Sequence, residues 1–418
     1  MRVLFISPNQ GLYNSATNGY GGVGWIAALQ QYIEKDSDIE LAMAFKHETD
    51  SQKKKIGNTT YYPIKAPSKK GIKKLIYYWY GYKKEVNNLW LINKLKDIVL
   101  DFKPDIIHIF GTEAEMCCIV GEVDTPCVIH IQGILNPIVN SYFPPGMNEQ
   151  TFMSLKHVRE FWLRNGIVFN YRRMRLAAAR ELVFINKCRY FLGRTEWDKG
   201  ITQLYNKEAD YYHIDEILRA DFYVANKWNY KAGKLQLIST ISPNAYKGLD
   251  IILNTAKLLK TNNITFCWKV IGVKESYFTR IIEKELNICH NDVNIKYLGV
   301  KNSKEIIELL HDSTIYVHPS YIDNSPNSLC EAQYIGVPCL STNVGGIPTI
   351  MENRHEYMVP ANAPHQLASK IISLERDLRE NRYINPFTEI ATNRHNPQII
   401  INSLKAAYHS VINSKKNI

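Results

Sequence analysis

Short apolar runs alternate with helix-forming stretches along the first half of the chain. The runs are Val3–Ile6, Glu40–Phe45, Ile106–Phe110, Cys127–Ile131 and Tyr190–Leu192, and we expect the fifth to be the last strand of this half. Near-continuous apolar runs of this length are typical of strands buried on both faces of a parallel sheet. The alternation therefore predicts an α/β fold in which helices cover a parallel sheet.

The same rhythm restarts after residues 224–234, a polar stretch without periodicity that we interpret as a connector. The strands expected beyond it are Leu235–Thr240, Phe266–Ile271, Ile295–Leu298, Thr314–His318 and Pro338–Ser341. The helices expected between them are Gly248–Lys260, Phe278–Leu286, Ser303–Leu310 and Asn327–Ile335. Because 418 residues exceed one ordinary core, we predict two doubly wound sheets in two domains.

Composition excludes several classes of protein. Apolar residues make up 45% and charged residues 22% of the chain, which is ordinary for globular proteins and excludes wholesale disorder. No run approaches the roughly 20 apolar residues of a membrane-spanning helix, and the amino-terminal apolar run before Pro8 is too short for a signal peptide. The eight cysteines form no CxxC pair and have no histidine at zinc spacing. We therefore expect a cytoplasmic chain with reduced thiols.

The positive charge is concentrated in the first half. The net charge is +11, yet residues 46–103 hold fourteen lysines against five acids, and residues 156–194 hold ten basic residues against two acids. Such an excess suggests an anionic partner for this half of the chain.

A glycine-rich string, Gly19–Gly24, matches the pattern GxGxxG of dinucleotide-binding proteins. The first strand ends a dozen residues earlier, and the second ends without a carboxylate for a ribose. An NAD(P)-dependent oxidoreductase is therefore disfavoured. Two interpretations stay open: a loop whose backbone N–H groups approach a phosphate or sugar, and a plain tight turn before a buried helix.

Residues 314–350 are the most informative segment. A strand ends at His318, and Ser325 and Pro326 have the residue types of a helix N-cap and first helical position. Free backbone N–H groups of the next three residues, Asn327, Ser328 and Leu329, would form an anion site. Glu331, one turn on, is suited to ribose hydroxyls, and Asp323, ahead of the helix, to sugar hydroxyls.

Lys247 follows the strand Leu235–Thr240 and opens a helix, where it can reach a phosphate across the crevice. A solvated lysine at a helix start is the alternative. No acidic pair suggests a metal ion that would neutralise a diphosphate. The string Asp36–Asp38 has the form DxD, but it precedes a strand and so lies at the wrong edge of the sheet for a ligand.

Together these segments resemble the retaining family-4 (group 1) glycosyltransferases of the bacterial surface-polysaccharide type. The resemblance is strong over residues 235–367 and weaker over residues 1–45 and 100–195. It rests on Asp323-x7-Glu331, which is similar to the Glu-x7-Glu motif of the family, and on YKGLDIIL, which resembles its Lys-Gly segment. The resemblance implies the GT-B fold, two Rossmann-like domains that face each other across a cleft.

The resemblance also implies roles for individual residues. Lys247, Asp323 and Glu331 would be the catalytic residues, contacting the diphosphate, the donor sugar and the ribose respectively. The residues expected to bind the donor are Gly21, Gly22, Gly299, Asn324, Ser325, Asn327, Ser328 and Leu329. Gln132 and Arg194 are candidate contacts to the acceptor or a phosphate.

Three departures from the family pattern bear on activity. The arginine that usually precedes the lysine is missing from residues 240–242, so one phosphate cation is absent or comes from elsewhere, such as Arg194 or Arg219. Gln132 stands where a histidine usually ends the strand, and the earlier His130 is better interpreted as a core histidine. Asp323 is one methylene shorter than the usual glutamate.

We therefore expect a retaining, metal-independent glycosyltransferase without a cofactor. Its substrates would be a nucleotide-sugar and a hydroxyl acceptor, either a glycan or lipid-linked, in cell-surface polysaccharide or glycolipid assembly. The alternatives are an inactive GT-B protein that binds nucleotide-sugar and a GT-B-fold epimerase. The expected domains are residues 1–205 on the acceptor side, residues 206–385 on the donor side, and a helical segment 386–418 that packs back towards the first domain.

Residues 69–84 interleave lysines with aromatic residues. Such a segment can lie on an anionic membrane surface, which would place the protein at the inner face of the cytoplasmic membrane. A solvated lysine face above an aromatic core is an equal alternative. Nucleic acid is not expected, because no nucleic-acid motif accompanies the charge.

Overall fold

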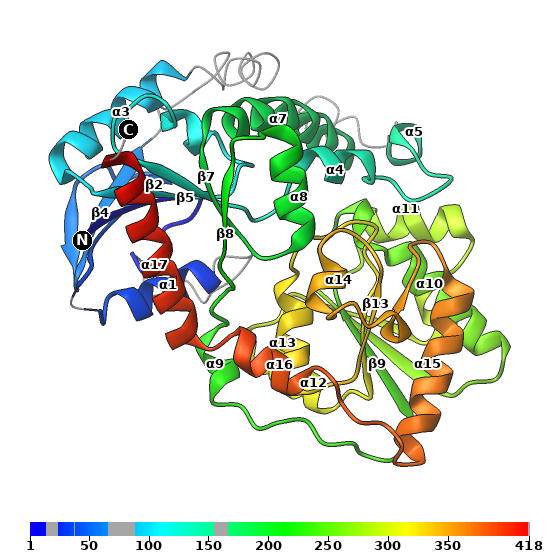
Figure 1. Cartoon of the computed structure of the whole chain (residues 1–418). Coiled ribbons are helices and arrows are strands. Elements are labelled where there is room, and N and C mark those ends of the chain that lie inside the picture. Colours follow the sequence, from blue (N-terminus) through cyan, green and yellow to red (C-terminus); the bar gives the residue numbers. More distant parts are fainter. Residues whose placement is uncertain (14–23, 37, 66–87, 154–165, 417–418) are drawn as a thin grey trace.

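The computed structural model contains two mainly parallel sheets, each with helices on its faces (Figure 1). The structure describes residues 1–13, 24–36, 38–65, 88–153 and 166–416. Both predicted sheets are present, so the α/β class with two doubly wound units is confirmed.

The first sheet has the order β3-β4-β2-β1-β5-β6-β7-β8. Its strands are β1 (Arg2–Ser7), β2 (Glu40–His47), β3 (Lys54–Ile56), β4 (Thr59–Lys65), β5 (Ile106–Phe110), β6 (Cys127–His130), β7 (Tyr190–Gly193) and β8 (Asp210–His213). Its helices are α1 (Gly24–Ile33), α3 (Leu89–Phe102), α4 (Leu135–Asn140), α5 (Glu149–Phe152), α7 (Ile167–Lys187) and α8 (Glu196–Tyr205), with the 3-10 turn η2 (Glu115–Ile119).

The second sheet has the order β11-β10-β9-β12-β13-β14. Its strands are β9 (Leu235–Thr240), β10 (Phe266–Ile271), β11 (Ile295–Gly299), β12 (Ile315–His318), β13 (Cys339–Thr342) and β14 (Met358–Val359). The elements around it are α9 (Ala220–Tyr223), η4 (Ala245–Lys247), α10 (Leu249–Thr261), α11 (Tyr277–Leu286), η5 (His290–Val293), α12 (Ser303–His311), α13 (Asn327–Ile335), α14 (Ile347–Ile350), η6 (His355–Tyr357), α15 (Pro364–Arg379) and α16 (Thr388–Arg394).

The first unit is larger than the sequence predicts. Strand β8 pairs in parallel with β7, so β7 is not the last strand, and the sheet continues past the expected boundary at residue 205. The chain crosses between the sheets after His213. Strands β3 and β4 were also missed. Strand β3 is exposed at every position, so it has no hydrophobic pattern to detect.

The carboxyl-terminal segment divides between the two units. Phe387 and Ala391 belong to the core of the second unit, past the expected boundary at residue 385. Helix α17 (Pro397–Lys416) instead lies beside α1 and the first sheet (Figure 1). The buried Tyr408 hydroxyl lies 2.5 Å from Nδ1 of His108 on β5, which ties the end of the chain to the first core.

The DxD string is part of this attachment. Lys405 Nζ on α17 lies 2.8 Å from a carboxylate oxygen of Asp36 and 2.8 Å from one of Asp38. These two acids therefore hold the last helix and do not face the ligand edge of the sheet. Among the described residues, no helix is both long and apolar enough to cross a lipid bilayer.

The packing of α17 gives a stability prediction. We expect Tyr408→Ala to lower the free energy of unfolding by about 3–5 kcal/mol, because it empties a fully buried site and leaves Nδ1 of His108 without its hydrogen-bond partner. Lys405→Ala, which removes two part-exposed ion pairs of the same helix, should cost about 1 kcal/mol. Urea unfolding followed by circular dichroism measures both, and equal midpoints for the two variants would contradict the assignment.

Candidate active site

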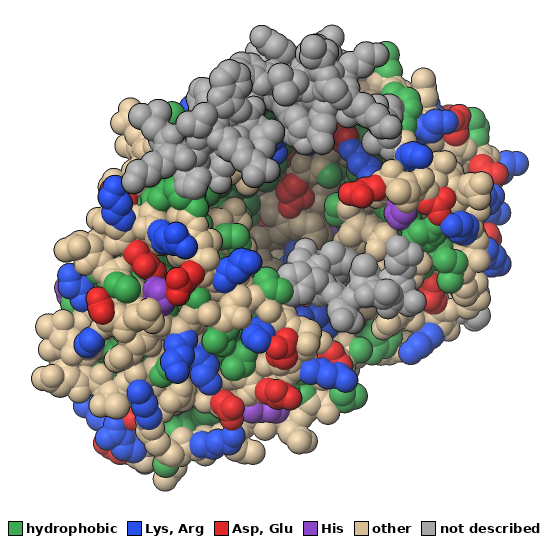
Figure 2. All heavy atoms as spheres, turned by 180° about the vertical axis from the view of Figure 1, so that it is seen from behind, with side chains coloured by type: hydrophobic (Ala, Val, Ile, Leu, Met, Phe, Trp, Pro, Cys, Tyr) green, Lys and Arg blue, Asp and Glu red, His purple; other side chains and the backbone are tan. Residues whose placement is uncertain are grey.

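A cavity of about 490 Å³ lies between the carboxyl edges of the two sheets. Trp25, Gln132 and Arg194 line it from the first unit. The residues that line it from the second unit include Lys247, His318, Asp323, Ser325, Asn327, Ser328 and Glu331. Figure 2 shows a hollow in the surface with acidic side chains inside it. The structure therefore brings Lys247, Asp323 and Glu331 together, as the sequence predicts.

Lys247 and Asp323 form an ion pair at the centre of the site, with 2.6 Å between Nζ and Oδ2. Gly248, the residue after the lysine, has a φ of +76°, and a Cβ there would lie 2.0 Å from the carbonyl oxygen of Pro319. Only glycine allows this close approach, which brings the start of α10 against the loop that carries Asp323.

His318 and Ser320 complete the surroundings of Asp323. His318 Nε2 lies 3.0 Å and Ser320 Oγ lies 3.2 Å from the same carboxylate oxygen. Burial alone would raise the pKa of Asp323, but the charge of Lys247 and the hydrogen bond from His318 outweigh it and hold that pKa well below its usual range. Asp323 is therefore a carboxylate at neutral pH.

Glu331 forms a two-pronged ion pair with Arg219, which lies just before α9. Nε and Nη2 of the arginine each lie 2.7 Å from a different carboxylate oxygen. Burial raises the pKa of Glu331, and the arginine opposes that shift. From the sequence, Arg219 was a candidate only for a cation that binds phosphate. In the structure it is the partner of Glu331, the residue expected to bind the ribose.

Asn324 bridges the two units instead of facing the cavity. Its Nδ2 donates to Asp198 Oδ2 at 2.8 Å and to the carbonyl oxygen of Gln132 at 3.2 Å, and its Oδ1 accepts from Thr195 Oγ1 at 2.7 Å. Every polar atom of this buried amide is thus used by the first unit, and its assignment to donor binding is wrong for the side chain.

Two details of the α13 start differ from the sequence prediction. Pro326, not Ser325, is the N-cap, and its side chain caps nothing. The N–H of Leu329 donates to the carbonyl of Pro326 at 3.0 Å, and the leucine side chain is fully buried in the second core. Leu329 is therefore not free to bind an anion, whereas Asn327 and Ser328 line the cavity.

Of the other residues predicted to belong to the site, some line the cavity and others do not. Gly299 ends β11 outside the cavity, and the next residue, Val300, lines it. Arg194 lines the cavity but is 3% exposed and pairs with the equally buried Glu216, so it is not a free phosphate cation. His130 is buried and lies 3.2 Å from His108, as a core histidine. Gly21, Gly22 and residues 69–84 lie outside the described residues.

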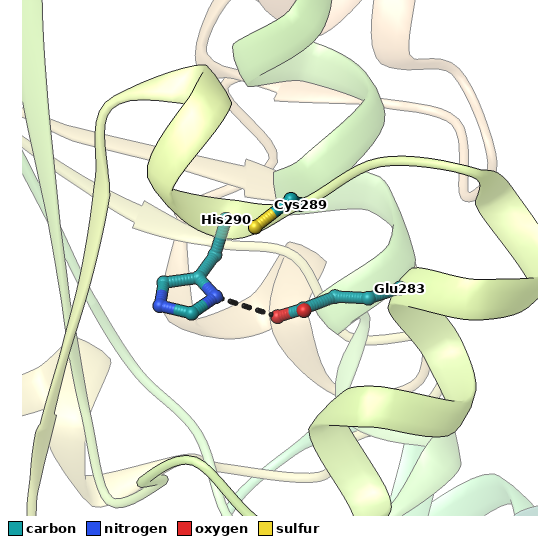
Figure 3. Close-up of side chains that lie close together, drawn as sticks. All are labelled: Glu283, Cys289 and His290. Carbon is teal, nitrogen blue, oxygen red and sulfur yellow. Dashed lines mark hydrogen bonds and ion pairs between the residues drawn. The ribbon is translucent and has the colours of Figure 1, made fainter.

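A group that could hold a metal ion lies outside this cavity (Figure 3). It consists of Glu283, Cys289 and His290. Oε1 of the glutamate already lies 2.9 Å from Nδ1 of the histidine and accepts the Tyr297 hydroxyl at 2.8 Å. Glu283 and His290 are thus already partners, and the group lies outside the cavity, so we assign it no role there. Metal independence stays a prediction.

Comparison with known proteins identifies the second unit. Residues 225–388 match the family described as glycosyl transferases group 1. This stretch is thus similar to the group 1 glycosyltransferases. The same domain carries Lys247, Asp323 and Glu331, so three residues predicted from the sequence lie inside the matched range.

Relatives and solved structures extend the comparison. WcaL from Salmonella typhimurium, named as a colanic acid biosynthesis glycosyltransferase, is 28% identical over 152 residues, or 34% of this chain and 36% of that protein. The matched part thus spans about a third of this curated relative. The sucrose-phosphate synthase from Thermosynechococcus elongatus has a TM-score of 0.70 at 11% identity over 99% of both chains. The HepE structure from Anabaena, solved with UDP, has a TM-score of 0.61 at 14% identity over 98% of this chain and all of that one. At such low identity these structures show the fold alone, which is GT-B.

The bridge formed by Asn324 gives a second prediction. Asn324→Ala removes three hydrogen bonds to buried and part-buried partners in the first unit, and we expect it to cost about 2 kcal/mol or more in the free energy of unfolding. Thr349→Ala removes a part-exposed contact to the backbone N–H of Glu196 at the same interface and should cost less. Thermal unfolding of both variants checks the order, and an Asn324 variant as stable as the wild type would contradict the bridge.

Proposed function

We propose that this protein transfers a sugar from a nucleotide-sugar to a hydroxyl acceptor in bacterial polysaccharide or glycolipid assembly. The observation that carries the proposal is the Lys247–Asp323 pair, which lies beside the start of α13 at the carboxyl edge of the second sheet. A cation, a helix start and a carboxylate are thereby gathered in one cavity of suitable size for a nucleotide-sugar. The group 1 family match and the name of WcaL support the same reaction and setting.

The pairing suggests how the donor is bound. A diphosphate attracts Lys247 more strongly than the single charge of Asp323, so the lysine turns to the phosphate and releases the carboxylate to the hydroxyls of the sugar. The first turn of α13, through Asn327 and Ser328, faces the same cavity and adds a favourable partial charge. Glu331 would bind the ribose, with Arg219 keeping it oriented and ionised.

In the proposed step the bond between the anomeric carbon and the phosphate oxygen breaks, and the acceptor oxygen bonds to that carbon. The hydroxyl proton passes to the departing diphosphate, so no separate base is required. We propose that the reaction retains the anomeric configuration and needs no metal ion, since Lys247 and the helix start supply the positive charge that a metal would otherwise supply.

Binding and release of nucleotide test the proposal. UDP-, GDP- and ADP-sugars are screened by thermal shift, and nucleotide release is measured with the donor that binds. We expect Lys247→Ala and Glu331→Gln to weaken donor binding and to slow release by 100-fold or more, because each removes a charged contact to the donor. Lys257→Ala, an exposed lysine on α10, is the matched control and should behave as the wild type.

The outcome also separates the rival functions. Donor binding without release would favour an inactive protein that binds nucleotide-sugar, and interconversion of the sugar while it stays on the nucleotide would favour an epimerase. Equal release from the lysine variant and the wild type would contradict the assigned site. Release that survives excess EDTA is expected, and loss of activity with the chelator would contradict metal independence.

We further propose that the first unit contacts an anionic membrane surface in the cytoplasm while it binds a lipid-linked acceptor. The sequence of residues 69–84 is rich in lysine. Among the described residues, the first unit also has exposed basic side chains on α7, at Arg172, Arg173 and Arg175. Flotation with vesicles of phosphatidylcholine alone or with added phosphatidylglycerol checks this. We expect recovery only with the anionic lipid, and equal recovery in both would overturn it.

A further inference from the structure

A group of metal-binding residue types lies on the second unit, outside the donor cavity. Among the residues that the structure describes, it is the group whose histidine, cysteine and carboxylate ligand atoms all lie within 4.8 Å of one another. Its members are Glu283, Cys289 and His290, and Figure 3 shows the three side chains turned toward one another. A thiolate, an imidazole and a carboxylate are the ligands that Zn²⁺ takes in proteins, whereas Mg²⁺ and Ca²⁺ take oxygen ligands.

The end of α11 and the turn after it hold the group in place. Asn287 ends the helix with a φ of +51°, and the N–H of Ile288 donates to the carbonyl oxygen of Glu283 at 3.0 Å. This turn reverses the chain, so that the next two residues lie beside the last turn of the helix. Ile288 and Val293, on either side of those two residues, are buried in the second core. The possible ligands are therefore positioned by packed elements.

Two further residues surround the group in the way that outer partners surround metal ligands. The Tyr297 hydroxyl on β11 donates to Oε1 of Glu283 at 2.8 Å, and its ring stacks on that of His290 with 4.4 Å between the centroids. Nε2 of His290 lies 3.6 Å from Oε1 of Glu275. A histidine that binds a metal through one nitrogen usually has a carboxylate near the other, and a ligating carboxylate is usually hydrogen-bonded in turn. Both kinds of outer contact are present around this group.

The positions of the ligand atoms fit Zn²⁺ after a small movement. Oε1 of Glu283 lies 2.9 Å from Nδ1 of His290. A tetrahedral zinc ion holds nitrogen and oxygen ligands about 3.3 Å apart, and a sulfur about 3.6 Å from either. The ion would take the place of the proton between Nδ1 and Oε1, and the imidazole proton would then lie on Nε2, towards Glu275. One thiolate and one carboxylate balance its two positive charges.

We propose that Glu283, Cys289 and His290 bind one Zn²⁺ ion. The thiol is exposed, so a water molecule from the solvent completes the tetrahedron. The thiol proton is released to solvent, because the thiolate is the form that binds a metal. The ion joins the end of α11 to η5, which leads into the edge strand β11, and so stabilises this edge of the second sheet.

The zinc site and the donor cavity are separate. The inference therefore does not rest on the proposed function, and the sugar transfer would still need no metal ion. The sequence did not indicate the site, because Cys289 and His290 are adjacent and do not have the spacing of a zinc finger. Only the turn at the end of α11 brings Glu283 to them.

Zinc binding by the full chain tests the proposal. The protein is freed of metal under reducing conditions, and Zn²⁺ is then titrated in competition with a chromophoric chelator. We expect the wild type to bind one ion per chain, and Cys289→Ser to bind it about 100-fold more weakly or worse, since even outer contacts of a metal site contribute about 10- to 100-fold. Cys289 is exposed, so this variant should fold. Cys267→Ser, which removes a partly exposed thiol outside the group, is the matched control and should bind as the wild type does.

Cobalt and a further variant distinguish a metal site from a cluster of hydrogen bonds. Co²⁺ bound to a thiolate has a near-ultraviolet charge-transfer band, which we expect in the wild type and Cys267→Ser but not in Cys289→Ser. Tyr297→Phe removes the hydrogen bond to Glu283 and should keep the band while weakening Zn²⁺ binding by about 10-fold. Zn²⁺ should raise the thermal midpoint of the wild type by a few degrees and leave that of Cys289→Ser unchanged.

Other results would overturn the inference. A wild type that binds no Zn²⁺, or binds it no more tightly than Cys289→Ser does, would remove the site, and so would a cobalt complex without the thiolate band. A wild-type midpoint that Zn²⁺ leaves unchanged would contradict the stabilising role. None of these measurements uses a nucleotide-sugar, so a failure of this inference and a failure of the proposed function are seen separately.

Discussion

The cavity depends on the pairing of charges that burial would otherwise make prohibitively costly. The ion pairs around it include Lys247 with Asp323, Arg219 with Glu331, and Arg194 with Glu216. Each joins two different segments. A buried charge without a partner costs several kcal/mol, so these pairs fix where the loops at the carboxyl edges of the two sheets must lie. Removing one partner disturbs two segments, not one.

The same pairs make the site responsive to a ligand. A pocket whose charges are already balanced does not attract nucleotides indiscriminately. An incoming diphosphate must attract Lys247 more strongly than Asp323 does. In the function proposed above, that exchange would also free Asp323 for the hydroxyls of the sugar. The arginine missing from residues 240–242 is not replaced by Arg219 or Arg194, because these two arginines of the cavity already pair with Glu331 and Glu216.

Local patterns were sufficient for the second unit and insufficient for contacts between units. The buried strands β9, β10 and β12 have apolar runs that the sequence reveals, and the lysine and two acids follow from their places after those strands. Strand β8 was missed because none of its residues is buried, so it carries no hydrophobic signal. Asn324 was misassigned for a different reason.

The neighbours of Asn324 in the sequence belong to the predicted donor site, but the hydrogen bonds of its side chain reach the start of α8 and the loop after β6. The Thr195–Asp198 capping box of α8 was readable in the sequence, yet nothing local shows that it would face residue 324. Arg219 likewise lies in an irregular stretch, and only the fold places it beside Glu331.

The fold also redistributes the basic surplus of residues 46–103. Lys53 pairs with Asp101, Lys54 with Asp50 and Lys94 with Asp97 inside this stretch, while Glu115 and Glu122 from outside it pair with Lys46 and Lys96. Internal pairs thus neutralise much of the described charge. Residues 66–87, which lie outside the described residues, hold six lysines against one acid in the sequence. The basic composition of that segment makes it the place to look for an anionic partner of the first unit, since the charged residues of the donor cavity are paired with one another.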